Sequence, residues 1–335
     1  MSAVPFLRHL TAAEVEAAMP PVDERLELAE RTLVALATPG AAELPAKIGV
    51  HPRPEGSFAH AMPAHLRARA APADDLLGMK WVAGFGANKS HGLPAISALV
   101  VLNDSSTGLP IAILDGGPIT AERTAAVSGV AIRRFAPLVK NRPIVVGLIG
   151  AGVQGHSHLA VLRHLLPAAR LRVHDRHPER AAALCEAARA AHGFASAEPV
   201  ASARTAVEDA DVVITAVSFT DATRRQAMTG DWLAPDALVV PVDYATMCAA
   251  AVAHDAALFL VDQREQFLAA RATGQFEGYP EPGATLGEAI AAGTARPARG
   301  RVVATHLGVG LADVVFGAAI LERAAAMGLG RELPR

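Results

Sequence analysis

The residues with the clearest chemical signature are the glycines of Gly150-Ala-Gly-Val-Gln-Gly155, which have the spacing G-x-G-x-x-G. They follow the apolar run IVVGLI and precede a run with helical spacing, which is the context that a phosphate-binding turn requires. Gly150 permits a tight turn, Gly152 lets the backbone approach a pyrophosphate, and Gly155 allows close helix–strand contact. With Val153 and Gln154 between them, they predict a dinucleotide site at a helix N-terminus. The alternative is a glycine turn without a ligand.

An acid and an arginine end the next apolar run, LRVHDR. A carboxylate at the position of Asp175 accepts hydrogen bonds from the adenosine ribose 2′-hydroxyl and repels a 2′-phosphate. Arg176 follows immediately and could pair with such a phosphate. The pattern therefore favours NAD as the cofactor and leaves NADP open.

Three further polar residues stand where a substrate could bind. Lys80 lies in the apolar segment GMKWVAGFG and Arg123 lies early in an expected helix, so either cation could hold a carboxylate. Asp243 closes the apolar run ALVVPVD. Ligands of doubly wound folds bind at the carboxyl ends of strands, so Asp243 could act as an acid or base. Each has a structural alternative: a lysine that reaches solvent, an exposed helical arginine, and the cap of a following helix.

The elements that would position these residues change in character near residue 143. Residues 11–38 predict two helices, the first opened by the capping-box pair Thr11 and Glu14. Residues 45–120 predict an antiparallel meander of short strands, and residues 118–137 predict a helix. From residue 143 apolar strands alternate with helices, which predicts a doubly wound parallel sheet. The tail from residue 305 predicts one long apolar helix.

Composition narrows the class of protein. A chain of 335 residues is too long for one compact core, so two domains are expected. The net charge of −2, without a basic patch, argues against nucleic acid as a partner. No apolar stretch is long enough for a membrane span, and the N-terminus does not have the pattern of a signal peptide. Cys185 and Cys248 favour a reduced cytoplasmic protein. The histidines show no metal-ligand spacing, so we expect no metal; we interpret His156 and His158 as structural or cofactor-edge residues, and His306 carries no spacing signal.

Several linked stretches together resemble the ornithine cyclodeaminase/mu-crystallin family. The resemblance extends from about residue 45 to the end of the chain, and the segment ITAERTAA followed by the glycine loop is more specific than the loop alone. The matching stretches are AMPA at 61–64, GMK at 78–80, TGLPIAILDGGPITAERTAA at 107–126, GLIGAGVQGHSH at 147–158, ADVVITAV at 210–217 and GVGLAD at 308–313.

The resemblance implies a fold and an assembly. The α/β fold would combine a Rossmann doubly wound parallel sheet with a smaller N-terminal α+β domain that the C-terminal helix completes. Residues 1–122 with 306–335 would form a substrate-binding and dimerisation domain, and residues 123–305 would bind NAD(P). The protein would be a homodimer, with the first domain supplying the dimer interface and half of the active site.

The resemblance also implies roles for the polar residues. Lys80 and Arg123 would hold the substrate carboxylate, and Asp243 would be the acid/base facing the substrate nitrogen. The family's first carboxylate-binding position is commonly an arginine; counting back from the Met-Pro pair gives Lys47 here, whereas Arg53 lies in a different register. A lysine lacks the bidentate fork of arginine, so this departure puts ornithine itself in question as the substrate.

The chemistry implied is hydride transfer at Cα of a small amino acid or cyclic imine. One such site could serve a cyclodeaminase, an amino-acid dehydrogenase or a ketimine reductase. The alternative from another class is a crystallin-like protein that binds cofactor and ligand without turnover. Retention of Lys80, Arg123 and Asp243 favours the enzyme.

Overall fold

The computed structural model describes residues 6–68, 71, 74–218, 220 and 222–334. The chain forms two compact units: unit 1 comprises Met1–Arg123 and Gly308–Arg335, and unit 2 comprises Thr124–Leu307. Helix α3 (Gly116–Phe135) crosses the boundary between the units. Among the described residues, none of the helices combines the length and apolar character that crossing a bilayer requires.

Unit 1 is built on a mixed sheet with the strand order β16-β1-β7-β6-β5-β4-β2, in which β3 also pairs with β4. Strands β4 to β7 form the expected antiparallel meander, whereas β1 pairs with β7 in parallel. The strands are β1 (Leu7–Leu10), β2 (Ala42–Glu43), β3 (Ile48–Val50), β4 (Phe58–Leu66), β5 (Leu76–Gly84), β6 (Ile96–Asn103), β7 (Pro110–Asp115) and β16 (Arg331–Leu333).

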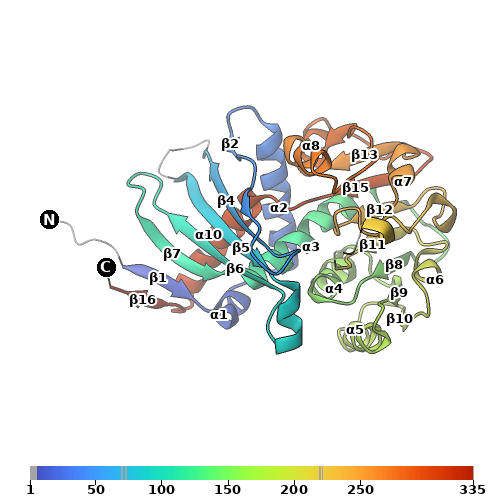
Figure 1. Cartoon of the computed structure of the whole chain (residues 1–335), viewed down its shortest axis with the longest axis horizontal. Coiled ribbons are helices and arrows are strands. Elements are labelled where there is room, and N and C mark those ends of the chain that lie inside the picture. The colour runs from blue at the N-terminus through green and yellow to red at the C-terminus, as the bar shows by residue number, and fades with distance from the viewer. Residues whose placement is uncertain (1–5, 69–70, 72–73, 219, 221, 335) are drawn as a thin grey trace. The chain divides into compact units, whose positions relative to one another are not determined.

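Among the residues that the structure describes, three α-helices lie wholly within unit 1. They are α1 (Ala12–Ala17), α2 (Val22–Ala37) and α10 (Gly310–Ala326). Helix α10 packs against β4, β5 and β6 and also contacts α1 and α2 (Figure 1). The capping box of Thr11 and Glu14 opens α1 as predicted. Because side chains alternate between the faces of a strand, β5 turns Gly78, Lys80 and Val82 towards the buried face.

Unit 2 is a doubly wound sheet of parallel strands in the order β10-β9-β8-β11-β12-β15-β13-β14, which confirms the predicted fold class. The strands are β8 (Val145–Ile149), β9 (Arg170–His174), β10 (Ser196–Pro199), β11 (Val212–Thr215), β12 (Leu238–Pro241), β13 (Leu258–Val261), β14 (Ala284–Thr285) and β15 (Val302–Thr305). The helices besides α3 are α4 (Val153–Leu165), α5 (Pro178–Ala190), α6 (Ala203–Val207), α7 (Ala250–His254), α8 (Arg264–Ala272) and α9 (Leu286–Ala291).

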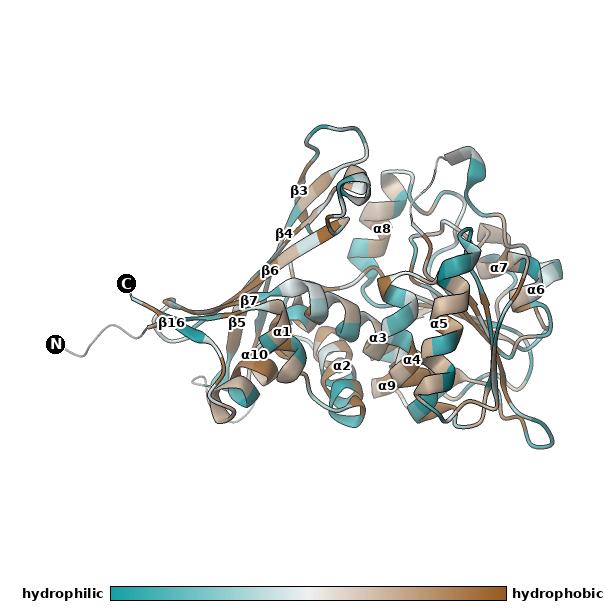
Figure 2. Cartoon of the chain, turned by 90° about the horizontal axis from the view of Figure 1, so that it is seen from below, coloured by the Kyte–Doolittle hydropathy of each residue, from teal (hydrophilic) through white to brown (hydrophobic). Residues whose placement is uncertain are grey.

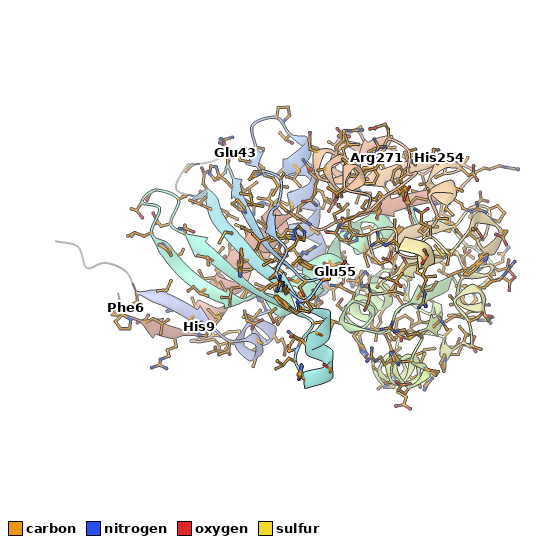
Figure 3. All side chains as sticks on the ribbon, viewed as in Figure 1. Phe6, His9, Glu43, Glu55, His254 and Arg271 are labelled. Atoms are coloured by element: carbon orange, nitrogen blue, oxygen red, sulfur yellow. The ribbon has the colours of Figure 1, made fainter. Side chains whose placement is uncertain are left out.

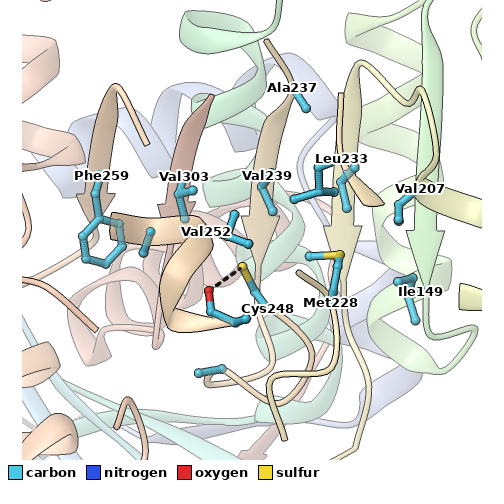
Figure 4. Packing of buried hydrophobic residues seen from close by; sticks show 14 of the residues in the cluster. Ile149, Val207, Met228, Leu233, Ala237, Val239, Cys248, Val252, Phe259 and Val303 are labelled. Carbon is cyan, nitrogen blue, oxygen red and sulfur yellow. Dashed lines mark hydrogen bonds between the residues drawn. The ribbon is translucent and has the colours of Figure 1, made fainter. Parts of the chain in front are cut away.

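The core of unit 2 is aliphatic near the centre of the sheet and aromatic at one end. Figure 4 shows Val239 of β12 and Val303 of β15 beside Val252 of α7, with Phe259 further along. Cys248 lies in the same cluster, and its thiol is directed at the Ala249 carbonyl oxygen. Burial of this kind contributes roughly 25 cal/mol per Å² of apolar surface, so these strands form a rigid support for the loops at their ends.

Two predicted helix boundaries need correction. Helix α3 begins at Gly116, before Pro118, because proline is tolerated in the first turn, where its missing N–H has no partner to lose. The tail does not become helical at residue 305. Thr305 ends strand β15, and Gly308 adopts a positive φ of 79°, which breaks the chain direction before α10 begins at Gly310.

Candidate active site

Unit 1 contains a buried cluster of two cations and one anion. Lys80 Nζ lies 2.7 Å from Asp313 Oδ2, and Arg123 Nε donates to Asp313 Oδ1 at 3.1 Å. The exposed fractions are 2% for Lys80, 5% for Arg123 and 0% for Asp313. A Cβ at Gly308 would lie 2.5 Å from the Arg123 guanidinium, so the guanidinium packs directly on the glycine backbone. Strand β5, helix α3, the turn at Gly308 and helix α10 thus meet at one charged centre.

Burial controls the charges in this cluster. It lowers the pKa of Lys80 to about 7, against an attraction from Asp313 that acts to raise it. Burial alone would raise the pKa of Asp313, but the charges of Arg123 and Lys80 outweigh it, so that pKa is lowered. Asp313 is therefore an ionised partner, and Lys80 is poised to change charge near neutral pH.

Asp313 was not singled out in the sequence. The available signal was a single acid inside the apolar run GLADVVFGAAIL, since an aspartate is almost never fully buried unless it is paired. What pairs with it could not be deduced, because Lys80 and Arg123 are distant in the chain.

Lys47 and His60 lie near this cluster. Lys47 precedes β3, is half-buried, and its positive charge contributes to the lowered pKa of Lys80, whereas Arg53 is exposed. Burial lowers the pKa of His60 to about 4, with further contributions from Lys47, His51 and Lys80. The His60 ring stacks on Phe58 at 4.7 Å. Sequence reasoning did not identify His60, because no motif marks a histidine whose role comes from its neighbours.

The glycine loop of unit 2 has three differently constrained glycines. A Cβ at Gly150, where φ is 106°, would lie 2.4 Å from the Ala216 carbonyl oxygen, and a Cβ at Gly155 would lie 2.4 Å from the Gly150 carbonyl oxygen. Packing within the protein therefore requires glycine at positions 150 and 155, whether or not a ligand binds. A Cβ at Gly152 would meet no atom within 4 Å. Gly152 is the N-cap of α4 without a side-chain cap, and the exposed Val153 follows it. This open helix end fits a pyrophosphate.

Asp175 connects this loop to the next strand. It follows β9, and its two carboxylate oxygens accept hydrogen bonds from the backbone N–H groups of Ala151 at 2.8 Å and His177 at 2.9 Å. The carboxylate is half-buried, and Arg176 beside it is exposed. Each oxygen retains a second lone pair, so the group can still accept from a ribose hydroxyl.

Asp243 lies beyond the end of β12 and is 3% exposed. The next two residues, Tyr244 and Ala245, have positive φ angles of 54° and 59°, a strained conformation for residues with a Cβ. The helix that follows, α7, has Ala249 as its N-cap, so Asp243 does not cap it. Burial raises the pKa of Asp243 to about 6, although hydrogen bonds act in the opposite direction. A carboxylate with such a pKa can exchange a proton near neutral pH.

The strand order brings several of these residues to one edge. Asp175, Gly150 and Asp243 follow the carboxyl ends of β9, β8 and β12, and His306 follows β15, which neighbours β12. The carboxyl edge of a doubly wound sheet is where ligands bind. Among the residues that the structure describes, no group of histidines, cysteines and acids has the arrangement of a metal site.

The fold and site define a Rossmann-type dinucleotide-binding protein with a second unit that carries buried cations. A model of the "Ornithine cyclodeaminase/mu-crystallin family" matches residues 8–326. The chain belongs to this family, which confirms the resemblance seen in its motifs.

Known proteins of several activities are similar to the chain. The nodulation efficiency protein NfeD of Rhizobium meliloti is 33% identical over 296 residues, 87% of each chain. The Thermococcus litoralis Δ1-pyrroline-2-carboxylate reductase, solved in complex with NADH and L-proline, has a TM-score of 0.84 at 25% identity, covering 98% of this chain and 100% of that one. An archaeal alanine dehydrogenase dimer with bound NAD has a TM-score of 0.83 at 25% identity, covering 98% and 99%.

Proposed function

We propose that the protein is an NAD-dependent oxidoreductase or cyclodeaminase that acts at Cα of a small amino acid or cyclic imino acid. The observation that carries the proposal is the buried pair Lys80 and Arg123, which share the single carboxylate of Asp313. Two cations and one anion leave a net positive charge, which suits a substrate carboxylate. The relatives include enzymes named for amino-acid oxidation and imine reduction.

Unit 2 would hold the cofactor. The amides at the start of α4 and the open side of Gly152 would receive the pyrophosphate, with Gly150, Val153, Gln154 and Gly155 shaping the loop. Asp175 would accept hydrogen bonds from the adenosine ribose hydroxyls. The exposed Arg176 could pair with the 2′-phosphate of NADP, which would bind as the weaker ligand. A bound nicotinamide would supply the hydride acceptor or donor.

Unit 1 would hold the substrate. Lys80, Arg123 and Lys47 would bind its carboxylate, with Asp313 keeping the first two cations in place. Asp243 would take the proton of the substrate amine before Cα is oxidised, and would return a proton to the nitrogen in the reductive direction. These assignments suit a dehydrogenase, a cyclodeaminase and a ketimine reductase equally.

A substrate panel tests the proposal. Small amino acids, including diamino acids, and cyclic imino acids would be assayed with NAD and NADP by the absorbance of the reduced nicotinamide and by ammonia release. Both readouts are needed, because cyclodeamination returns the hydride and leaves no net reduced cofactor. If the protein binds NAD and amino acids but turns over none of them in either direction, the non-catalytic, crystallin-like alternative holds instead.

We further propose a cytoplasmic homodimer. The face of the unit 1 sheet opposite Lys80 is apolar at Met79, Trp81, Leu99 and Val101, and Trp81 and Leu99 are 42% and 43% exposed. Figure 2 shows α1, α2 and α10 on the other side of this sheet. A second copy would cover the apolar face, in line with the dimer of the archaeal relative. Both cysteines are free and buried, as suits a reducing compartment.

The dimer proposal predicts that a charge on this face yields monomers. Trp81→Glu should dissociate the dimer, because an unpaired charge in an apolar interface carries a large desolvation cost. Light scattering at micromolar protein concentration measures the oligomeric state. The control is Leu138→Glu, at a side chain that is 92% exposed in unit 2. A wild-type monomer would contradict the proposal.

The cofactor assignment predicts that Asp175→Ser weakens NAD binding by roughly 10- to 150-fold, since a hydrogen bond to a charged group contributes about 1.5–3 kcal/mol. The affinity for NADP relative to NAD should rise, because the repulsion of the 2′-phosphate is removed. Fluorescence titration measures both. Asp175→Asn, which keeps the shape, separates the loss of charge from any loosening of the glycine loop. Tighter binding of NADP than NAD by the wild type would reverse the assignment.

The shifted pKa values of Asp243 and Lys80 predict a bell-shaped pH dependence of kcat/KM for amine oxidation. Asp243 must be ionised to accept a proton, so the rate should rise through pH 6 or so, where its pKa lies. Lys80 must be charged to hold the carboxylate, so the rate should fall above about pH 7. If kcat/KM fell only near the ordinary lysine pKa of 10.5, the pKa of Lys80 would not be lowered in the free enzyme.

A further inference from the structure

A histidine lies beside the buried cations of unit 1, on the same face of the sheet. In the register of strands β4 and β5, Met62 lies opposite Lys80 and His60 lies opposite Val82. Directly opposite residues of an antiparallel pair point to the same face, and diagonal neighbours such as His60 and Lys80 are within reach of long or aromatic side chains. Met62 and Val82 pack together with Ala98, which agrees with this assignment of the face. The function proposed above assigns no role to His60.

The chain just before strand β3 adds Lys47 to this face. Gly49 is paired with His60, and counting two residues along each strand puts Lys47 level with Met62. Because side chains alternate between the faces of a strand, Lys47 points to the same face as position 49. The positive charge of Lys47 contributes to the lowered pKa of His60 and to that of Lys80, as this placement requires. His60 thus lies beside two of the cations that we assign to the substrate carboxylate.

Two glycines and a phenylalanine fix the position of the His60 ring. A Cβ at Gly49 would lie 2.6 Å from His60 Cδ2, so the imidazole lies directly over this glycine. A Cβ at Gly84 would overlap the ring of Phe58 in the same way. The two rings stack with their centroids 4.7 Å apart. The half-buried imidazole therefore has a defined position next to the cations before any ligand binds.

The electrostatic surroundings of His60 are positive. The pKa of His60 is lowered to about 4 by burial and by the positive charges of Lys47, His51 and Lys80, so its ring is neutral at neutral pH. The acid nearest to it in the chain, Glu55, is exposed in the loop between β3 and β4. A cationic group of a ligand next to the His60 ring would therefore meet charges of its own sign, which strongly disfavours binding.

We propose that His60 contacts the substrate beyond its carboxylate and selects a substrate without a second amine. The inference rests on the proposed function, in which Lys47, Lys80 and Arg123 bind that carboxylate. These three positive charges are opposed by two negative ones, those of Asp313 and the bound carboxylate, so the surroundings of His60 keep a net positive charge. A terminal ammonium is repelled there, whereas the neutral imidazole can pack against an aliphatic group or form a hydrogen bond with a neutral polar one.

This specificity limits the reaction. Cyclodeamination needs a second amine of the substrate, which bonds to the imine carbon and displaces ammonia. A substrate with one amine loses a hydride from Cα to the nicotinamide and a proton from nitrogen to Asp243, and water then hydrolyses the imine. In the reverse direction an imine takes up the hydride and the proton. The enzyme is therefore an amino-acid dehydrogenase or an imine reductase, and not a cyclodeaminase.

Matched pairs of substrates test the inference on the wild-type protein. L-Ornithine and L-norvaline, like L-2,4-diaminobutyrate and L-2-aminobutyrate, differ only in a terminal ammonium group. The diamino acid of each pair should have a kcat/KM at least about 10²-fold lower, measured by reduced nicotinamide and by ammonia release, because contact between like charges is strongly unfavourable. Where turnover is slow, calorimetric titration of the NADH-loaded protein compares the affinities. A diamino acid that binds or reacts as well as its partner would overturn the inference and leave the proposed oxidoreductase intact. Failure of every amino and imino acid to bind would contradict the proposed function itself.

Substitution of His60 tests whether this residue sets the preference. His60→Glu places a carboxylate beside Lys47 and Lys80 and should raise kcat/KM for L-ornithine relative to L-norvaline by roughly 10- to 150-fold, the effect of a hydrogen bond to a charged group. His60→Gln is neutral and should keep the wild-type preference. The matched control is His254→Glu, since His254 at the end of α7 bonds the Gly278 carbonyl oxygen at the surface (Figure 3). An unchanged ratio in a folded His60→Glu protein would overturn the inference, as would an equal change in His60→Gln.

Discussion

Replacing Asp243 with asparagine should lower kcat by about 10²–10⁴-fold, the usual contribution of a general acid or base. Asparagine keeps the shape of the side chain but cannot take a proton from the substrate amine. Cofactor affinity should barely change, because Asp243 lies at the end of β12, whereas the loop of Gly150 to Gly155 follows β8. Steady-state kinetics with a substrate identified by the panel, together with NAD titration by fluorescence, measure both quantities.

The effect on KM distinguishes the proposed roles. Asp243→Asn should change KM less than kcat, whereas Lys80→Ala should weaken substrate binding and also lower the rate. Asp255→Asn is the matched control, since Asp255 is an exposed aspartate of the same unit. If Asp243→Asn retained near wild-type kcat, the strained turn at Tyr244 and Ala245 would have a structural role, and the proton acceptor would lie elsewhere.

Replacing Asp313 with asparagine should destabilise the protein by about 3–5 kcal/mol, because removal of one partner leaves buried charge uncompensated. Lys80 and Arg123 would both lose the carboxylate that holds them. Urea or thermal unfolding without ligand measures the loss. Asp231→Asn is the control: Asp231 pairs with Arg204 at the surface, where such pairs contribute about 0–1 kcal/mol.

The loss of stability in Asp313→Asn, called the deficit below, should decrease as pH rises. Burial holds the pKa of Lys80 near 7, and removing Asp313 removes an attraction that raises it. Without Asp313 the pKa of Lys80 lies lower than in the wild type, so below both values Lys80 is charged in both folded proteins and the deficit is full. The deficit should shrink as pH rises from the variant's lower pKa to about 7, and above about 7, where Lys80 is neutral in both proteins, only the part that Arg123 contributes should remain. A deficit that is constant across this range would mean that Lys80 is not the principal partner of Asp313.

The local features of this protein could be predicted from its sequence. A strand, a glycine turn and a helix adjoin in the chain, so the spacing of Gly150, Gly152 and Gly155 was enough to predict the loop and its place in a parallel sheet. The capping box at Thr11 was equally local. The family motifs pointed to Lys80, Arg123 and Asp243 as candidates, but not to what surrounds them.

The environments of these side chains arise from contacts between segments that are far apart in the chain. Asp313 stands 233 positions after Lys80 in the chain, counting from 80 to 313, and their contact exists because α10 returns to pack on β5. A shifted pKa such as that of Lys80 depends on burial and on charged partners in space, and these are properties of packing that no local pattern of residues encodes.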